Sequence, residues 1–282
     1  MPIAYPDILS LKSDPKAYAW TVKDSALYAL GVGMAADPLN EAELDFVYEK
    51  AIKSIPTQAG VVAWGALPGD MGLNFALLVD GERRIVFHRP LPPSGSVNAA
   101  CQVTGVWDKG AGKGAVVAFD TELSDPATGA LLQTLTTTFF ARGDGGFGGP
   151  SEGQPEPHPI PSRAPDVSLD LATRPDQALL YRLSGEYNPL HADPAFAKMV
   201  GFPRPILHGM CTYGVTCRAV LQTYADYDPT RIKSHQARFS APVFPGETIT
   251  VDLWRDDDVV SFEARVQARG VTVIKNGKTV LG

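Results

Sequence analysis

Glu186, Asn188 and His191 place a carboxylate, an amide and an imidazole within six residues of the segment "YRLSGEYNPLHADP" (181–194). A carboxylate beside an imidazole can divide the acid and base steps of a proton-transfer reaction. Pro189 lies between them and prevents a regular helix, because its ring fixes the backbone angle and removes a donor. The segment therefore predicts either a rigid catalytic loop or an ordinary polar turn, and the neighbouring elements must distinguish the two.

Several segments that could position this loop have recognisable patterns. Apolar residues at helical spacing predict helices within 25–35 and 175–185, and a long helix from Gly209 to Tyr224 that should be buried because most of its faces are apolar. The Asn-Gly pair of "KNGK" (275–278) predicts a β-hairpin. Strand-like runs separated by turns are expected within residues 83–91, 96–107, 115–125, 131–142, 233–243, 247–255, 259–269 and 271–281.

The chain also repeats itself. Tyr28 of "LYALGVG" and Tyr181 of "LYRLSGE" are 153 positions apart, and Pro90 and Pro242 are 152 apart. Two matched segments at nearly one offset indicate an internal duplication. We predict two α+β copies, residues 1–141 and 167–282, joined by a Gly/Pro-rich linker at 142–166. Each copy is an antiparallel sheet wrapped around a central helix, although in the first copy that helix is short and broken near residues 57–70.

Composition narrows the class of protein. With 44% hydrophobic and 20% charged residues, the 282-residue chain is typical of a globular protein. A net charge of −6 without a Lys/Arg run argues against nucleic-acid binding. No apolar stretch reaches the roughly 18–20 residues that a membrane helix needs, and no secretory signal is visible. Three cysteines, an odd number without metal-ligand spacing, fit a reducing cytoplasm.

Together these motifs resemble one family. The segment 181–214, with "NPLHADP" and "PILHGM", is similar to the signature of the MaoC-like, type 2 (R-specific) enoyl-CoA hydratases. "LYALGVG", "DFVYE", "PLPPSG", "GGFGG" and "ARFSAPVFPGETI" follow the family order over nearly the whole chain. The hydratase domain of peroxisomal multifunctional enzyme type 2 and its bacterial stand-alone relatives are similar to it. The resemblance implies a tandem (double) hot-dog fold, with the catalytic copy at the C-terminus.

The resemblance also implies a reaction of fatty acid metabolism, the reversible hydration of trans-2-enoyl-CoA to (3R)-3-hydroxyacyl-CoA. Glu186 and His191 would activate water, and Asn188 would help to position them. The backbone N–H of Gly209 would hold the thioester oxygen, since a helix N-terminus favours negative charge. No cofactor and no metal are expected.

Substrate contacts and assembly follow from the same resemblance. Glu49 of "DFVYE", His208 of "PILHGM" and Arg204 are candidates for substrate binding, Arg204 toward a CoA phosphate. Each also has a structural alternative as a packing or surface residue. Asn40 stands where the first copy would carry a counterpart of His191, so we expect one active site per chain. We expect a homodimer in the cytoplasm whose partners are CoA thioesters.

One position departs from the family. Where the family has Asp, this chain has Glu186, which keeps the charge but adds a methylene. A shift of about 1 Å at a catalytic group can cost on the order of 10²-fold in rate. The alternative is therefore an acyl-CoA-binding or thioesterase-type hot-dog protein with little hydratase activity.

Overall fold

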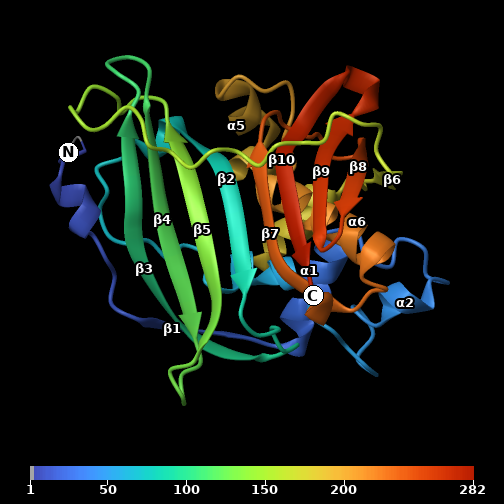
Figure 1. Ribbon diagram of the computed structural model, residues 1–282. Helices are drawn as coiled ribbons and strands as arrows, with labels where there is room; N and C mark the ends of the chain where they lie inside the picture. Colours follow the sequence, from blue (N-terminus) through green and yellow to red (C-terminus); the bar gives the residue numbers. More distant parts are fainter. Residues whose placement is uncertain (1–2) are drawn as a thin grey trace.

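A single antiparallel sheet of ten strands runs through the protein in the computed structural model, which describes residues 3–282 (Figure 1). The strands lie in the order β1-β3-β4-β5-β2-β7-β10-β9-β8-β6. Their bounds are β1 (Lys16–Trp20), β2 (Leu78–Phe87), β3 (Gly95–Asp108), β4 (Ala115–Ser124), β5 (Leu131–Ala141), β6 (Val167–Ala172), β7 (Ile232–Phe239), β8 (Thr248–Asp256), β9 (Val259–Val266) and β10 (Val271–Leu281). The short strands β1 and β6, which have no clear sequence pattern, form the two edges.

The two halves of this sheet are related by a pseudo-twofold axis at the β2–β7 junction. Arg84 pairs with Gln236 at the middle of that ladder, and the two residues are 152 positions apart, the same offset as Pro90 and Pro242. The ladder therefore maps onto itself when the two copies are exchanged, as a pseudo-twofold axis requires. The strand order is mirrored in the same way. The predicted α+β tandem of two hot-dog units is confirmed.

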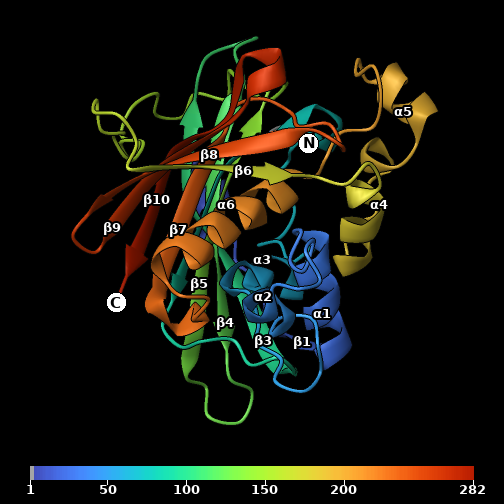
Figure 2. The same ribbon diagram turned by 90° about the vertical axis from the view of Figure 1, so that its right-hand side faces the viewer.

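The long helix α6 (Gly209–Tyr224) has the predicted bounds and is buried along most of its length. Strands β7 to β10 curve around it (Figure 2). Its Tyr213 hydroxyl donates to the carbonyl oxygen of His235 on β7 at 2.6 Å. An apolar helix that meets one concave sheet buries its side chains on many sides, which accounts for its lack of a polar face.

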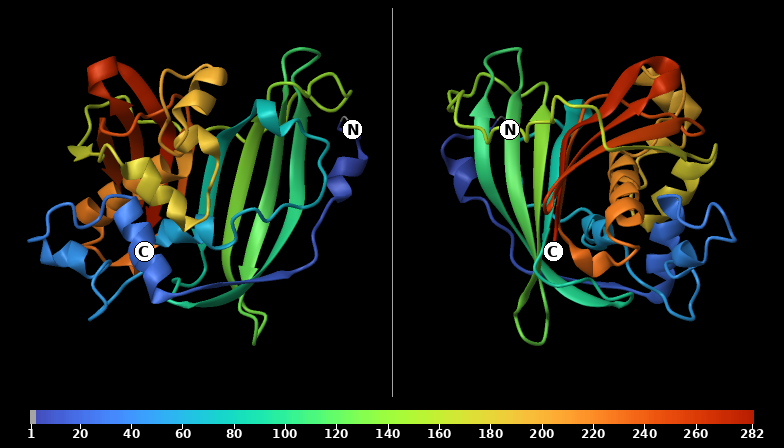
Figure 3. Two further views of the ribbon diagram at one scale, coloured as in Figure 1. Left: turned by 180° about the vertical axis from the view of Figure 1, so that it is seen from behind. Right: turned by 45° about the vertical axis from the view of Figure 1, so that its right-hand side comes forward.

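In the first repeat only η2 (Pro56–Gln58) and α3 (Ala59–Val62) stand in place of α6. Residues 63–77 cross the inner face of β3 to β5 instead, and the N-terminal segment runs along the free edge of β3 (Figure 3). Ile3, Ile8, Met71 and Leu73 of these segments pack into a second apolar core. The first repeat is thus incomplete, as predicted.

Shorter helices complete the chain. Residues 142–166 pass from β5 to β6 without a helix or strand, and the domain boundaries there stay predictions. The remaining elements are α1 (Val22–Gly31), α2 (Glu41–Leu44), α4 (Gln177–Tyr181), α5 (Pro194–Met199) and the 3₁₀ turns η1 (Asp7–Ser10), η3 (Phe75–Leu77), η4 (Arg182–Ser184), η5 (Pro189–His191), η6 (Pro229–Arg231) and η7 (Gln267–Arg269).

The repeated tyrosines identified in the sequence meet at the junction of the two copies. Tyr28 of α1 and Tyr181 of α4 have ring centroids 5.9 Å apart, and both side chains are buried. Gln177 at the start of α4 donates from its side chain to the carbonyl oxygen of Leu30 at 3.3 Å. The first helices of the two repeats therefore pack directly on each other.

The prediction of a hairpin at "KNGK" is wrong, because strand β10 continues through these residues. Gly277 pairs with Phe262 on β9. The register shifts between Ile274 and Gly277 against β9 and between Lys275 and Lys278 against β7, which marks a β-bulge. Asn276 has a φ of 54°, but Gly277 does not adopt a positive φ. A two-residue type I′ hairpin needs positive φ at both central residues, so the pair forms a bulge instead.

Replacing Gly277 with Ala tests this arrangement. An added Cβ would overlap the buried ring of Phe262, and overpacking of this kind costs about 1–3 kcal/mol. We expect Gly277→Ala to lower the free energy of unfolding by that amount in a denaturant titration. Asn276→Gly should change it by less than about 1 kcal/mol, since Gly accepts positive φ readily. Equal effects of the two substitutions would contradict the bulge.

Candidate active site

The loop that follows α4 is held by its own polar residues. Gly185 has a φ of 124°, which turns the chain out of η4 toward Glu186. The Asn188 side-chain oxygen then accepts from the N–H of Leu190 at 3.0 Å and caps η5. Asn188 is itself exposed. Its visible task is thus to hold the turn that presents His191.

His191 lies buried at the end of this turn. Its Nδ1 atom is 2.9 Å from the carbonyl oxygen of Ile206, so Nδ1 carries the proton and donates it. Nε2 is then left with a free lone pair. Burial lowers the pKa of His191, although the bond to Ile206 opposes that shift. The side chain is therefore a neutral, oriented base.

His208 packs against this base from the residue before α6. The two imidazole rings are stacked, with centroids 3.7 Å apart and planes at 25°. The His208 Nε2 atom is 3.3 Å from the backbone oxygen of Glu186, so the ring also ties down that residue's main chain. Burial, with His191 next to it, lowers the pKa of His208 to about 3. His208 thus stays neutral and positions both partners.

Glu186 is half-buried, and burial raises its pKa to about 7. A carboxylate oxygen of Glu186 and a ring nitrogen of each of His191 and His208 all lie within 4.8 Å of one another. A carboxylate and two imidazoles can also bind a divalent cation. Here, however, the two rings are stacked, so their in-plane lone pairs lie in two nearly parallel planes, which is unfavourable for binding one ion. The geometry suits proton transfer better than metal binding.

Two charged residues of the other repeat act on this cluster. Asp80 on β2 adds to the effect of burial and raises the pKa of Glu186, while Arg83 opposes it. The two form an ion pair at 2.6 Å, and Arg83 also donates to the hydroxyl of Thr137. Sequence reasoning missed both. The repeat offset could have indicated that β2 lies beside β7, but not that its first residues reach the catalytic loop.

Gly209 is the first residue of α6 and follows His208 directly. Within residues 3–282 its N–H has no protein acceptor, as expected for the first amides of a helix. A Cβ at this position would meet the ring of Phe239 at 3.3 Å, so Gly keeps the approach to the amide open. The N–H can therefore receive a negatively charged oxygen.

Buried polar atoms without a protein partner gather around the same loop. In native proteins such atoms usually bind water or a ligand. Together with the neutral His191, they describe a polar enclosure able to hold a reacting water. The atoms in question, among residues 3–282, are Arg83 Nε, Tyr181 OH, Arg182 Nε, Ser184 Oγ and His208 Nδ1.

Two predicted substrate contacts lie outside this cluster. Glu49 is exposed beyond α2, and the buried carboxylate of that segment is Glu43, which pairs with Arg218 of α6 at 2.8 Å. Arg204 is exposed, with its guanidinium 5.0 Å from the centroid of the Phe244 ring. The structure thus brings together Glu186, His191, His208 and Gly209, with Asn188 as the cap of the turn.

Comparison with known proteins agrees with this geometry. Residues 18–143 match the MFE-2 hydratase 2 N-terminal domain, and residues 157–277 match the MaoC like domain. Enoyl-CoA hydratase ChsH3 of Mycobacterium tuberculosis is 41% identical over 264 residues, 91% of each chain. The peroxisomal enoyl-CoA hydratase 2 of Arabidopsis thaliana is 38% identical, covering 95% of this chain and 92% of the plant protein. A crystal structure of a MaoC-like dehydratase from Phytophthora capsici has a TM-score of 0.88 at 34% identity, covering 98% of this chain and 97% of that one.

The sheet, the central helix and these matches define a double hot-dog protein. The chain belongs to the family of MaoC-like, type 2 enoyl-CoA hydratases, and it is an enzyme of the hydro-lyase class. Within residues 3–282, no helix is long and apolar enough to cross a membrane.

Proposed function

We propose that this enzyme hydrates trans-2-enoyl-CoA reversibly to (3R)-3-hydroxyacyl-CoA, with His191 and Glu186 sharing the proton transfers. One observation carries the proposal. A neutral imidazole with a lowered pKa and a carboxyl group with a pKa raised to about 7 lie within 4.8 Å of each other. Pairs whose pKa values are pushed apart by their surroundings are typical of acid–base catalysis. The (3R) configuration comes from the family resemblance.

In the hydration direction His191 Nε2 takes a proton from the water that attacks C3. The bond from Nδ1 to Ile206 fixes the tautomer that this step needs. Glu186 in its acid form delivers a proton to C2. After the addition His191 holds the proton that Glu186 has lost, and transfer of one proton from His191 to Glu186 through solvent restores the starting state. In the reverse direction the same two groups exchange roles.

Charge develops on the thioester oxygen during this attack. The Gly209 N–H at the start of α6 is placed to receive it, with the helix dipole behind it. Arg204 on its exposed loop is assigned to the CoA phosphates. Asn188 and His208 hold the loop in place. Glu49 is exposed beyond α2, and its role in substrate binding stays a prediction.

The short helix of the first repeat has a consequence for the acyl chain. Only η2 and α3 occupy the position of α6 there, and we infer that a long acyl group is accommodated beside this shortened segment. Ile3, Ile8, Met71 and Leu73 fill one part of the inner face of that repeat with apolar side chains. The homodimer and the cytoplasmic location stay predictions.

An assay of two reactions separates the proposal from its alternative. We expect the purified enzyme to hydrate crotonyl-CoA and longer trans-2-enoyl-CoA substrates, seen as the loss of enoyl-thioester absorbance, and to form the (3R) product on chiral analysis. Release of free thiol from saturated acyl-CoA should stay at background. Thiol release without hydration would indicate a thioesterase, and binding of acyl-CoA without either reaction would indicate a binding protein.

A further inference from the structure

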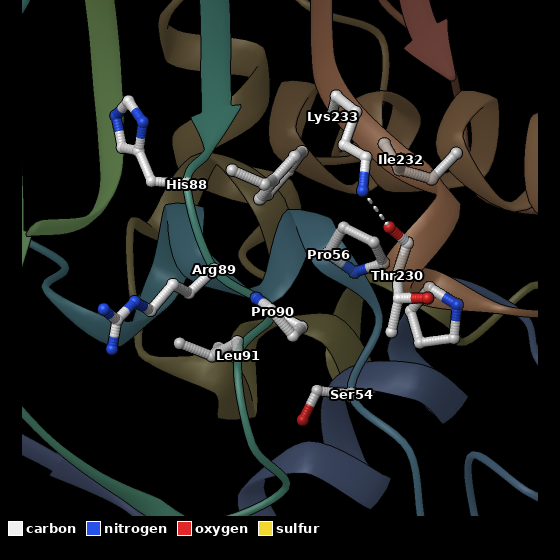
Figure 4. A pocket seen from close by; sticks show the side chains of 11 residues that line it. Ser54, Pro56, His88, Arg89, Pro90, Leu91, Thr230, Ile232 and Lys233 are labelled. Atoms are coloured by element: carbon white, nitrogen blue, oxygen red, sulfur yellow. Dashed lines mark hydrogen bonds between the residues drawn. The ribbon is translucent and has the colours of Figure 1, made fainter. Parts of the chain in front are cut away.

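A second cavity lies at the far end of β2 from the catalytic loop. Asp80 and Arg83 near the start of β2 act on Glu186, whereas Phe87 at its end lines a cavity of about 80 Å³. Figure 4 shows this cavity between the chain that follows β2 and the start of β7. None of the residues proposed above for hydration lines it.

The pseudo-twofold axis relates this cavity to the mouth of the catalytic site. Phe87 in its wall is the counterpart of Phe239, the ring that faces Gly209. Pro90 is likewise the counterpart of Pro242. At the same offset Pro56, the first residue of η2, aligns in sequence with His208, the residue before α6. The cavity is therefore the equivalent entrance in the first repeat.

Its catalytic groups have been lost. Pro56 offers no imidazole where the second repeat has His208, and Asn40 replaces the base His191. Neither a proline ring nor an amide can transfer protons at neutral pH. The cavity thus lacks the groups that acid–base chemistry requires.

Its charged side chains also differ from those of the catalytic entrance. At the repeat offset of 152, Lys233 stands in place of Gly81 and Arg89 in place of Ala241. Ile232 moreover replaces the carboxylate of Asp80. The buried His235 replaces Arg83, the ion-pair partner of Asp80, so that pair is lost as a whole and Lys233 and Arg89 are the added cations. Arg89 also helps to lower the pKa of Asp125, a carboxyl group of the exposed β4–β5 turn.

The donors in this cavity are available. The Lys233 Nζ atom donates to the carbonyl oxygen of Thr230 at 2.9 Å, which uses one of its three protons. Figure 4 shows this amine directed toward Thr230 within the cavity, whereas the Arg89 and His88 side chains point away from it at the rim. Space for a few water molecules suits one phosphate group and excludes an acyl chain.

We propose that this basic entrance of the first repeat is a second, non-catalytic site that binds a phosphate group, carried by CoA or as free inorganic phosphate. Lys233 neutralises the anion inside the cavity, and Arg89 adds positive charge at the rim. CoA is the favoured carrier because the equivalent entrance in the second repeat admits a CoA thioester. Binding here does not depend on hydration, so the site can exist even if the reaction proposed above is wrong.

Calorimetric titration at low ionic strength tests the site. With CoA we expect two molecules bound per chain of the parent enzyme and one in Lys233→Ala. Lys113→Ala, which removes an exposed lysine of the β3–β4 turn, should still bind two. The site that depends on Lys233 should weaken as salt is added, because its attraction is electrostatic. The hydration rate at low substrate should agree within about twofold among the three proteins.

A parallel titration with inorganic phosphate separates the two carriers. Phosphate binding that is lost in Lys233→Ala, with only one CoA per parent chain, would support the site and identify free phosphate as its ligand. If the parent binds one CoA per chain and shows no phosphate binding that depends on Lys233, the proposal is wrong.

Discussion

His191→Ala should lower kcat for enoyl-CoA hydration by roughly 10³-fold while the enzyme stays folded. General acid–base groups contribute about 10²–10⁴-fold, and His191 is the one neutral imidazole of the cluster with its Nε2 free. The ring sits in a loop beside His208, so its loss removes a stacking contact instead of part of the central core. The measurements are steady-state kinetics on a trans-2-enoyl-CoA and thermal unfolding of the same preparation.

A matched control is available in His158, whose Nε2 is hydrogen bonded to the Ser261 hydroxyl far along the sheet. His158→Ala should keep kcat within a few-fold of the parent. Free imidazole added to His191→Ala should restore part of the activity, since the truncated side chain leaves a space of that shape. A folded His191→Ala enzyme with nearly the parent rate would mean that the base lies elsewhere.

Much of the architecture could be predicted because it depends on local patterns. The run of apolar residues from Gly209 to Tyr224 predicts a buried helix wherever it packs, and α6 has those bounds. The offset of Pro90 and Pro242 reflects a duplication that the β2–β7 ladder repeats at Arg84 and Gln236. Predicting these features does not require knowing which segments pack against each other across the sheet.

The features that could not be predicted depend on contacts between distant segments. "KNGK" has the composition of a hairpin, and only the pairing of Gly277 with Phe262 makes it a bulge. Asp80 acts on the catalytic loop because β2 crosses from the other repeat, a contact over more than 100 residues of chain. The stacking of His208 on His191 likewise requires the loop and the start of α6 to fold together.

The same crossing gives the first repeat a role, although all the proposed catalytic groups lie in the second. The second repeat supplies Glu186, His191 and Gly209, but the charges that act on Glu186 from β2 belong to the first. An isolated second repeat would lose Asp80 and Arg83 and would expose the edge of β7. An unpaired edge strand invites aggregation. The first repeat thus contributes the charges of Asp80 and Arg83 near Glu186, and its strand β2 pairs with the edge of β7.

Glu186→Gln should remove most of the hydration activity, about 10²–10³-fold in kcat, without destabilising the protein. Gln has nearly the size of Glu and can form hydrogen bonds, but it can neither accept nor deliver a proton. The Glu186 pKa is raised to about 7, so between roughly pH 4.5 and 7 the folded state holds a proton that the unfolded chain has lost. Stability contributed by Glu186 therefore falls as pH rises through that window, and Gln avoids the loss. We expect Glu186→Gln to unfold at the same temperature as the parent or higher at pH 8.

The pH profile and the Asp variant complete this test. In the parent, kcat/KM for hydration should fall about tenfold per pH unit above pH 7, because the acid form of Glu186 is lost there. Glu186→Asp restores the residue of the family and should keep or raise kcat, with an alkaline limb still present. Glu186→Gln should lack that limb. If Glu186→Gln turns over as fast as the parent with the same profile, the carboxyl group transfers no proton. The raised pKa would then reflect burial alone, and Glu186 would be an ordinary polar residue of the turn that presents His191.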